Sequence, residues 1–157
     1  MLSKFALRKK CLEKREIFFK KKGSECLKLK DIEVIILEIK SKLKISSIGI
    51  YYPIKSEISP LKLIEICKNL SIRICLPVIC KNTNELIFSK FDNETNIIKN
   101  EYGIIEPNKI SQIIPDIIFV PMVGFDKTLN RLGYGKGYYD RTISKLRKLK
   151  KIFFIGL

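Results

Sequence analysis

The sequence predicts an α/β protein in which a mostly parallel sheet is flanked by helices. A strand, a helix and a second strand are expected in succession between residues 45 and 76, which is the order of a βαβ unit. Ile117–Pro121 is almost wholly apolar, as in a central strand that is buried on both faces. With 157 residues, 46% of them hydrophobic, the chain suits one compact domain over residues 1–157.

The chain is expected to begin with two helices. Residues 3–22 contain neither Pro nor Gly, and apolar residues such as Leu7 and Phe18 recur at nearly helical steps. The opposite face of this helix is strongly basic. A second helix is expected after Gly23 and should end near Leu43.

The βαβ unit follows these helices. Residues 45–52 are expected to form its first strand, because β-branched and aromatic residues are frequent there and a proline comes next. Ser59 supplies an N-cap and Pro60 a first-turn proline for a helix over Pro60–Asn69. Ile72–Leu76 is expected to be the second strand, which Pro77 should stop.

The second half of the chain should add three strands and one helix. The expected strands cover Leu86–Phe91, Ile117–Pro121 and Lys151–Leu157, the expected helix covers Tyr138–Lys148, and Asp92–Asn100 should form a loop. The buried strand leads into a glycine-rich region, which should therefore lie outside the carboxyl ends of the strands, where open α/β sheets bind their ligands.

The absence of histidine excludes several catalytic classes. Ser-His-Asp and Cys-His mechanisms and His-ligated metal sites are impossible, so acid, base or metal chemistry must rest on carboxylates, Lys and Tyr. The five cysteines form no C-x-x-C pair and cannot all be bridged, which favours a reduced setting. The basic N-terminus does not resemble a signal peptide, and charges interrupt the apolar runs. We therefore expect a cytoplasmic protein with no membrane partner.

The charge balance favours anionic ligands. Lys and Arg number 31 against 16 Asp and Glu, which gives a formal net charge of +15. Nucleic acid and small phosphates would both suit this charge. Most of these cations are lysine, in a chain that is also rich in isoleucine, which indicates a general compositional bias as much as a nucleic-acid surface.

The densest motif is RLGYGKGYYDR at residues 131–141. Gly133, Gly135 and Gly137 stand at alternate positions between the buried strand and a helix. Glycines so placed let the backbone approach a ligand and present N–H groups, and the helix N-terminus adds partial positive charge. Lys136 adds a full charge. An anion is the expected ligand, although glycines also serve ordinary turns and the motif is neither a Walker A loop nor G-x-G-x-x-G.

The residues around these glycines could complete a nucleotide site. Asp140 follows the loop, where a carboxylate can bind the Mg²⁺ that bridges polyphosphate oxygens, or can instead cap the helix or pair with Arg141. Tyr134, Tyr138 and Tyr139 offer ring faces for a flat heterocycle, and core packing would explain any one of them equally well.

Two segments resemble the signature of the 5-formyltetrahydrofolate cyclo-ligase family, also called methenyltetrahydrofolate synthetases. These segments are Val120–Asp126, with the sequence VPMVGFD, and residues 131–141. The resemblance extends in order to Lys4-x-x-Leu7-Arg8, Tyr51–Glu57 and Tyr102–Pro107, and so covers essentially the whole chain. It implies a Rossmann-like three-layer sandwich, which agrees with the α/β class predicted above.

The resemblance also implies a reaction. Members of this family use ATP and Mg²⁺ to convert 5-formyltetrahydrofolate into 5,10-methenyltetrahydrofolate, with release of ADP and phosphate. The γ-phosphoryl group of ATP would be placed on the formyl oxygen, and attack by N10 of the same folate would close the ring as phosphate departs. Such chemistry depends on positioning and charge neutralisation, so it needs no histidine.

Site roles follow from the resemblance by position. Lys136 and Arg131 would be catalytic, Lys136 by steadying charge on the transferred phosphoryl group, and Asp140 would bind Mg²⁺. The ATP-binding residues would be Lys4, Arg8, Arg131, Leu132, Gly133, Tyr134, Gly135, Lys136, Gly137, Tyr138 and Tyr139. The folate-binding residues would be Tyr52, Glu57, Tyr134, Gly135, Lys136, Gly137 and Tyr138. Without the resemblance, Lys4 and Arg8 would be solvated cations and Glu57 an ordinary loop carboxylate.

The chain departs from the family pattern after Leu157. Members generally continue with a segment that carries acidic residues, one of which helps to bind the metal. The second metal ligand therefore has no candidate by motif here. Two expectations stay open, a reduced but active enzyme and a catalytically impaired remnant that binds folate or nucleotide.

A nucleic-acid-binding module that uses the basic first helix is the rival from another class. No nucleic-acid motif accompanies that helix, and the aromatic residues cluster in the glycine-rich loop instead of among its cations. We therefore expect a monomeric enzyme whose partner is 5-formyltetrahydrofolate, with no specific nucleic acid.

Overall fold

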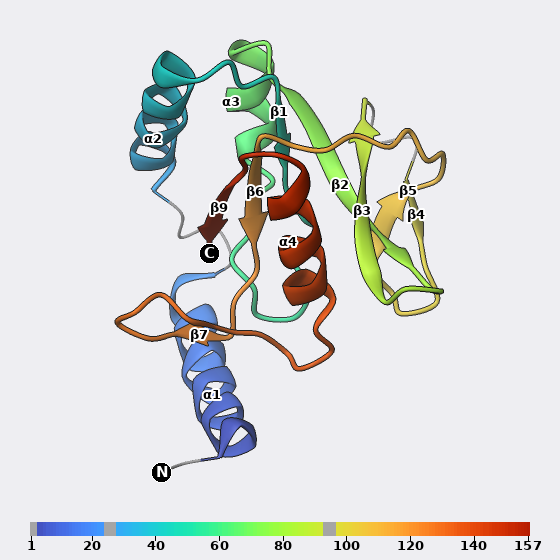
Figure 1. Ribbon diagram of the computed structural model, residues 1–157. Coiled ribbons are helices and arrows are strands. Elements are labelled where there is room, and N and C mark those ends of the chain that lie inside the picture. The colour runs from blue at the N-terminus through green and yellow to red at the C-terminus, as the bar shows by residue number, and fades with distance from the viewer. Residues whose placement is uncertain (1–2, 24–27, 93–96) are drawn as a thin grey trace.

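A five-stranded mixed sheet forms the centre of the computed structural model, which describes residues 3–23, 28–92 and 97–157 (Figure 1). Its strands, in the order β3–β2–β1–β6–β9, are β3 (Glu85–Phe91), β2 (Arg73–Cys80), β1 (Ser47–Gly49), β6 (Ile117–Val120) and β9 (Phe153–Gly156). β1 pairs in parallel with β2 and β6, and β6 with β9, whereas β3 runs antiparallel to β2. The predicted mostly parallel sheet is confirmed.

The structure describes four helices, which are α1 (Lys4–Lys22), α2 (Leu29–Lys42), α3 (Leu63–Asn69) and α4 (Tyr138–Leu149). Of these, α2 and α3 pack on one face of this sheet and α4 packs on the other. Ile117 and Phe119 of β6 pack in the core beneath α2 and α3, and Ile118 and Val120 pack in the core beneath α4. This alternation explains why the segment is apolar throughout, as predicted for a strand buried on both faces. Among the described residues, no helix combines the length and apolar character needed to span a membrane.

α1 stands apart from these layers, on the side of the molecule toward which β6 and β9 point (Figure 1). Ser3 caps it, with the Ser3 Oγ accepting a hydrogen bond from the Ala6 N–H at 3.2 Å. None of its residues is buried. The position of α1 therefore depends on polar contacts more than on apolar burial. The predicted start of the second helix falls partly on residues 24–27, which lie outside the described residues.

α3 begins three residues later than predicted. The carbonyls of Pro60 and Leu61 accept hydrogen bonds from the N–H groups of Leu63 and Ile64, each at 3.0 Å, which makes a tight turn before the helix. The Ser59 Oγ accepts a hydrogen bond from the Leu61 N–H at 3.4 Å, so it caps this turn and not the helix itself.

β2 continues through Pro77, so the prediction that this proline stops the strand is wrong. β2 pairs with β1 only as far as Cys75, so Pro77 faces no ladder partner on that side. On the other side it stands opposite Phe88, whose carbonyl accepts a hydrogen bond from Ile113 instead. The missing N–H therefore costs no ladder hydrogen bond, and the strand runs on to Cys80.

Part of the predicted loop over Asp92–Asn100 is also a strand. β4 (Ile97–Lys99) pairs antiparallel with β5 (Ile105–Pro107). The Asn100 Oδ1 accepts hydrogen bonds from the N–H groups of Tyr102 and Ile104, each at 3.0 Å, and so shapes the turn between them. Residues 93–96 of the predicted loop lie outside the described residues.

A second small hairpin, formed by β7 (Gly124–Phe125) and β8 (Arg131–Leu132), leads into the glycine-rich loop. The Asp126 Oδ1 accepts hydrogen bonds from the N–H groups of Thr128 and Asn130, each at 2.9 Å. Hydrogen bonds from the Asn130 and Thr128 side chains and backbone lower the pKa of Asp126 to about 2. This turn fixes the end of the hairpin from which residue 131 enters the loop.

Candidate active site

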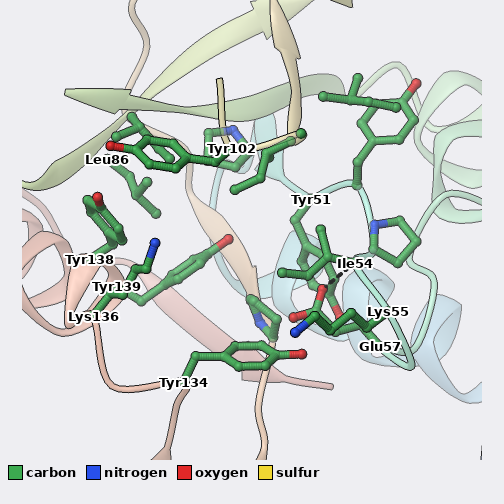
Figure 2. Close-up of a pocket in the computed structure, with 18 of the residues that line it drawn as sticks. Tyr51, Ile54, Lys55, Glu57, Leu86, Tyr102, Tyr134, Lys136, Tyr138 and Tyr139 are labelled. Atoms are coloured by element: carbon green, nitrogen blue, oxygen red, sulfur yellow. Dashed lines mark hydrogen bonds between the residues drawn. The ribbon is translucent and has the colours of Figure 1, made fainter. Parts of the chain in front are cut away.

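A cavity of about 620 Å³ lies between the glycine-rich loop, the loop after β1 and the β4–β5 turn (Figure 2). The predicted site residues that line it are Tyr52, Glu57, Arg131, Tyr134, Gly135, Lys136, Gly137, Tyr138 and Tyr139. The predicted site residues outside its lining are Lys4, Arg8, Leu132, Gly133 and Asp140. The structure thus brings the proposed folate residues and most of the glycine-rich loop around one cavity, outside the carboxyl end of β6.

Tyrosine is the characteristic residue of this cavity. All six tyrosines of the chain line it, although they come from the loop after β1, the β4–β5 turn, the glycine-rich loop and α4. Figure 2 shows labelled tyrosines on several sides of the space. Burial raises the pKa of the Tyr51 and Tyr139 hydroxyls, so both remain protonated donors at neutral pH. Such walls suit a flat heterocycle with polar edges.

Glu57 is a buried carboxylate in the wall of this cavity. The residue is 3% exposed. Its Oε2 accepts a hydrogen bond from the Ile54 N–H at 2.9 Å. Burial raises the pKa of Glu57, while the Ile54 hydrogen bond and the charge of Arg15 oppose that rise. A buried acceptor among tyrosines can recognise a ligand edge that is rich in N–H donors.

Arginine side chains pack against the glycines of the loop. Gly135 and Gly137 have φ values of +104° and +72°. A Cβ atom at Gly135 would lie 3.3 Å from the Arg8 Cζ, and one at Gly137 would lie 2.8 Å from the Arg141 Nη1. Arg141 also donates from Nη2 to the Lys136 carbonyl at 2.7 Å. These glycines therefore provide both a left-handed backbone and room for guanidinium groups.

Arg131 is a largely buried cation of the site, with its side chain 16% exposed. Its Nη1 donates to the Pro121 carbonyl at 3.0 Å and its Nη2 to the Asp140 Oδ1 at 2.5 Å, while its Cζ lies 5.6 Å from the Tyr139 ring centroid. Its Nε is buried and has no hydrogen-bond partner among the described residues. A buried guanidinium N–H without a partner is suited to a phosphate oxygen.

Asp140 lies in the first turn of α4 with its side chain 65% exposed, and it pairs with Arg131 and not with Arg141. In the described part of the chain, no group of three or more Cys, Asp and Glu residues could hold a metal ion. A divalent ion at Asp140 would therefore take most of its oxygens from a bound ligand and from water. A single exposed carboxylate beside a polyphosphate is compatible with Mg²⁺, which often uses few protein ligands.

Lys136 connects the glycine-rich loop to the β4–β5 turn at the cavity. Its Nζ lies 4.8 Å from the centroid of the Tyr102 ring, which stands on the β4–β5 turn (Figure 2). An ion pair of 3.1 Å between Lys81 and Glu101 joins that turn to the turn between β2 and β3. The glycine-rich loop and the β4–β5 turn therefore meet through a cation and an aromatic ring that both belong to the cavity lining.

Arg15 of α1 is a site residue that the sequence interpretation missed. Its Nη1 donates to the Met122 carbonyl at 2.9 Å, its Nε to the Ser56 Oγ at 3.2 Å, and its Nη2 to the Tyr134 hydroxyl. Arg8 on the same helix donates from Nε to the Gly133 carbonyl at 2.7 Å.

A sequence signal could have found these contacts. Four of the six arginines in this lysine-rich chain gather at the glycine-rich loop, and they are Arg8, Arg15, Arg131 and Arg141. Arginine offers a planar fork of donors that lysine lacks, so a scarce arginine in such a composition marks a position where that fork is used.

The fold and this site define an α/β protein with an arginine-backed glycine-rich loop beside an aromatic cavity. Comparison with known families makes the class specific. The model of the 5-formyltetrahydrofolate cyclo-ligase family matches residues 1–156, and the chain belongs to this family. The family predicted from the sequence is thereby confirmed.

Individual relatives agree with this assignment. The chain is 36% identical over 148 residues to the 5-formyltetrahydrofolate cyclo-ligase of Mycoplasma pneumoniae, which covers 94% of this chain and 80% of the relative. It is 35% identical over 117 residues to the Haemophilus influenzae protein of the same name. This alignment covers 71% of this chain but only 62% of that relative. The solved structure of Aquifex aeolicus 5,10-methenyltetrahydrofolate synthetase is similar, with a TM-score of 0.66 and 28% identity, over 99% of this chain and 77% of the other.

Proposed function

We propose that this protein catalyses the ATP-dependent cyclisation of 5-formyltetrahydrofolate to 5,10-methenyltetrahydrofolate, with release of ADP and phosphate. The observation that carries the proposal is that two features of this chain, which belongs to the family, lie next to each other. An arginine-backed glycine loop, suited to phosphates, shares a wall with a cavity that is lined by all six tyrosines and by a buried glutamate.

The nucleotide phosphates are assigned to the glycine-rich loop. The unpartnered Nε of Arg131 supplies a buried donor there, and the N-terminus of α4 adds partial positive charge. Lys4 and Arg8 add cations from α1, where Arg8 lies against Gly135 and Lys4 precedes it by one helical turn. This surplus of positive charge next to backbone N–H groups favours a polyphosphate over a neutral ligand.

The folate ring is assigned to the tyrosine-lined cavity. Glu57 would accept hydrogen bonds from the donor-rich edge of the pterin, because it is a buried acceptor in a cavity wall that it shares with tyrosines. Tyr52, Tyr134 and Tyr138 would contact the ring system. With these assignments the same loop would face both substrates, and the formyl group would lie near the terminal phosphoryl group.

The chemistry proceeds in two displacements. The formyl oxygen attacks the γ-phosphorus of ATP, and the bond to ADP breaks. N10 of the folate then attacks the formyl carbon, the ring closes, and the activated oxygen leaves as phosphate while N10 loses its proton. Lys136 and Arg131 would steady negative charge on the transferred phosphoryl group, since both line the cavity on the loop side.

Asp140 is the residue that would hold Mg²⁺ together with the ATP phosphates. When bound, the ion would neutralise phosphate charge and orient the polyphosphate. The exposed Asp140 carboxylate stands beside Arg131, so this chain's own contribution is to keep a carboxylate and a guanidinium at the rim of the phosphate site.

The test is formation of the methenyl product, followed by its absorbance, with the purified chain, Mg·ATP and 5-formyltetrahydrofolate. We expect turnover that requires both ATP and the divalent ion and that releases one ADP for each product. Binding of both ligands without product would identify a catalytically impaired binder. Failure to bind either ligand, together with salt-sensitive binding of unrelated RNA, would favour the nucleic-acid alternative.

A further inference from the structure

We propose that Arg15 is a positioning residue that couples the nucleotide side of the site to the folate side, so that each substrate strengthens binding of the other. This inference rests on the function proposed above. It adds a residue that lies outside the cavity lining and outside the motifs that suggested the reaction.

The guanidinium of Arg15 joins three loops at the carboxyl end of the sheet. Ser56 belongs to the loop after β1, Met122 to the connection between β6 and β7, and Tyr134 to the glycine-rich loop. The Nε, Nη1 and Nη2 atoms each serve a different loop. A lysine, with one nitrogen on a flexible stem, could not reach all three acceptors in this fixed geometry.

Tyr134 continues this connection to the folate side. Its hydroxyl accepts the hydrogen bond from Arg15 and also interacts electrostatically with the Glu57 carboxylate. In Figure 2 the Tyr134 ring extends from the glycine-rich loop toward the side of the cavity where Glu57 lies. Glu57 directly follows Ser56, so Arg15 holds both the backbone segment that carries Glu57 and the tyrosine that contacts it.

The other end of the connection is α1 itself. Arg8 and Arg15 are two helical turns apart, and both face the glycine-rich loop. α1 buries none of its residues, so these polar contacts carry much of its attachment. An anionic nucleotide held by Lys4 and Arg8 would stabilise the docked position of α1. Docked α1 in turn holds Tyr134 and the Glu57 segment in place for folate.

The acceptors of Arg15 are neutral. In the part of the chain that the structure describes, no ion pair joins Arg15 to a carboxylate. The link from α1 to the loops therefore depends on the orientation of hydrogen bonds, which is sensitive to small displacements of the helix. Because coupling between two binding sites is reciprocal, folate should tighten nucleotide binding by the same factor.

Calorimetric titration tests this coupling directly. The dissociation constant for 5-formyltetrahydrofolate is measured with and without a saturating non-hydrolysable ATP analogue and Mg²⁺. We expect the analogue to lower it about tenfold in the wild type, within the usual range of such couplings. In Arg15→Gln the effect should fall below about twofold, and Arg15→Lys, which keeps the charge but not the fork, should not restore it.

Two further variants make the result decisive. Lys14→Gln removes a neighbouring exposed cation and should keep the wild-type coupling. Tyr134→Phe deletes only the hydroxyl that links Arg15 to Glu57 and should lose the coupling, which tests the idea even if Arg15→Gln fails to fold in circular dichroism and thermal unfolding. Undiminished coupling in folded Arg15→Gln or Tyr134→Phe, or a wild type that binds both ligands independently, would overturn the inference while leaving the proposed function intact. A wild type that binds neither ligand would remove both.

Discussion

The Nη2 of Arg131 lies 2.5 Å from the Oδ1 of Asp140, so the proposed phosphate-binding cation and the proposed metal-binding carboxylate form one ion pair. The pair is asymmetric, because the Arg131 side chain is 16% exposed and the Asp140 side chain 65% exposed. Arg131 is also held by its hydrogen bond to the Pro121 carbonyl. Asp140 is therefore the partner that can turn toward an arriving cation while Arg131 keeps its place.

Asp140→Asn should weaken the apparent affinity for Mg²⁺ without loss of fold. The amide oxygen can still accept the hydrogen bond from Arg131, but it lacks the charge that attracts the ion. We expect the Mg²⁺ concentration for half-maximal activity to rise about tenfold at fixed ATP. Asp92→Asn, at another exposed carboxylate, is the control. An unchanged Mg²⁺ titration would mean that Asp140 serves only to position Arg131.

Lys136→Ala should lower kcat by about 10²- to 10³-fold, because the loss of one positioned charge at a phosphoryl-transfer site has this order of effect. Lys136 is exposed, so far-UV circular dichroism and thermal unfolding should stay unchanged. Lys148→Ala removes an exposed cation from α4 and provides the matched control. Near-normal turnover of Lys136→Ala would contradict its catalytic assignment.

Glu57→Gln should raise the KM for folate more than the KM for ATP. A hydrogen bond to a charged group contributes about 1.5–3 kcal/mol. The KM for folate should therefore rise about tenfold or more, while the KM for ATP should change by less than about twofold. Steady-state kinetics with each substrate varied in turn make the comparison. The opposite ranking would show that Glu57 does not contact the folate.

Glu57 should also shape the pH dependence of stability. Burial raises its pKa above the ordinary value of 4.5, so between 4.5 and the raised pKa the folded protein holds a proton that the unfolded chain has released. The free energy of unfolding should therefore fall as pH rises through that window. Urea unfolding across the window should show this decline in the wild type and a smaller one in Glu57→Gln. Equal slopes in the two proteins would contradict the prediction.

Asp116 should matter for stability and not for catalysis. It lies just before β6, at the opposite end of that strand from the site, and its Oδ2 accepts hydrogen bonds from the N–H groups of Ser46 and Ser47 at 2.8 and 3.0 Å. Asp116→Ala would leave these donors unsatisfied, which should cost about 1–3 kcal/mol of unfolding free energy. Its kcat at a permissive temperature should equal that of the wild type. Asp92→Ala, which removes an exposed carboxylate, should change stability far less.

Acidification should distinguish the same variant. Burial alone would raise the pKa of Asp116, but hydrogen bonds from Lys150, Ser46 and Ser47 hold it below the ordinary value of 3.8. Its stabilising contribution is therefore complete above pH 3.8 and is lost as pH falls through the lowered pKa. Asp116→Ala should lose less stability than the wild type over that range. Parallel acid-denaturation curves would contradict this assignment.

The local pattern predicted most elements of the fold, and its errors have a common origin. α1, α4, β3, β6 and β9 lie within about two residues of the predicted positions, because their periodicity and breakers are local properties. Pro77 was misjudged because its tolerance depends on where its neighbours β1 and β3 direct their hydrogen bonds. The β4–β5 hairpin was missed because its short strands are defined by pairing with each other and by the Asn100 turn.

The candidate site divides in the same way. The glycine-rich motif and the resemblance to a family predicted the glycine-rich loop, its tyrosines and Glu57 as site residues. They did not indicate that Tyr51 and Tyr102 would share one cavity with them, since these residues are far apart in sequence. Nor did they show that Arg8 and Arg141 fill the space that the glycines leave, because that space exists only after α1 and α4 have packed.

The sequence by itself determined the α/β class, the family and the position of the glycine-rich loop, because hydrophobic periodicity, backbone freedom and charge are properties of neighbouring residues. Only the tertiary structure decided which charges meet. It joined Arg131 to Asp140, placed Glu57 among tyrosines and put Arg15 between three loops. The physical reason is that a hydrogen bond or ion pair depends on distances of about 3 Å between groups that the chain brings together only when the sheet and its helices have packed.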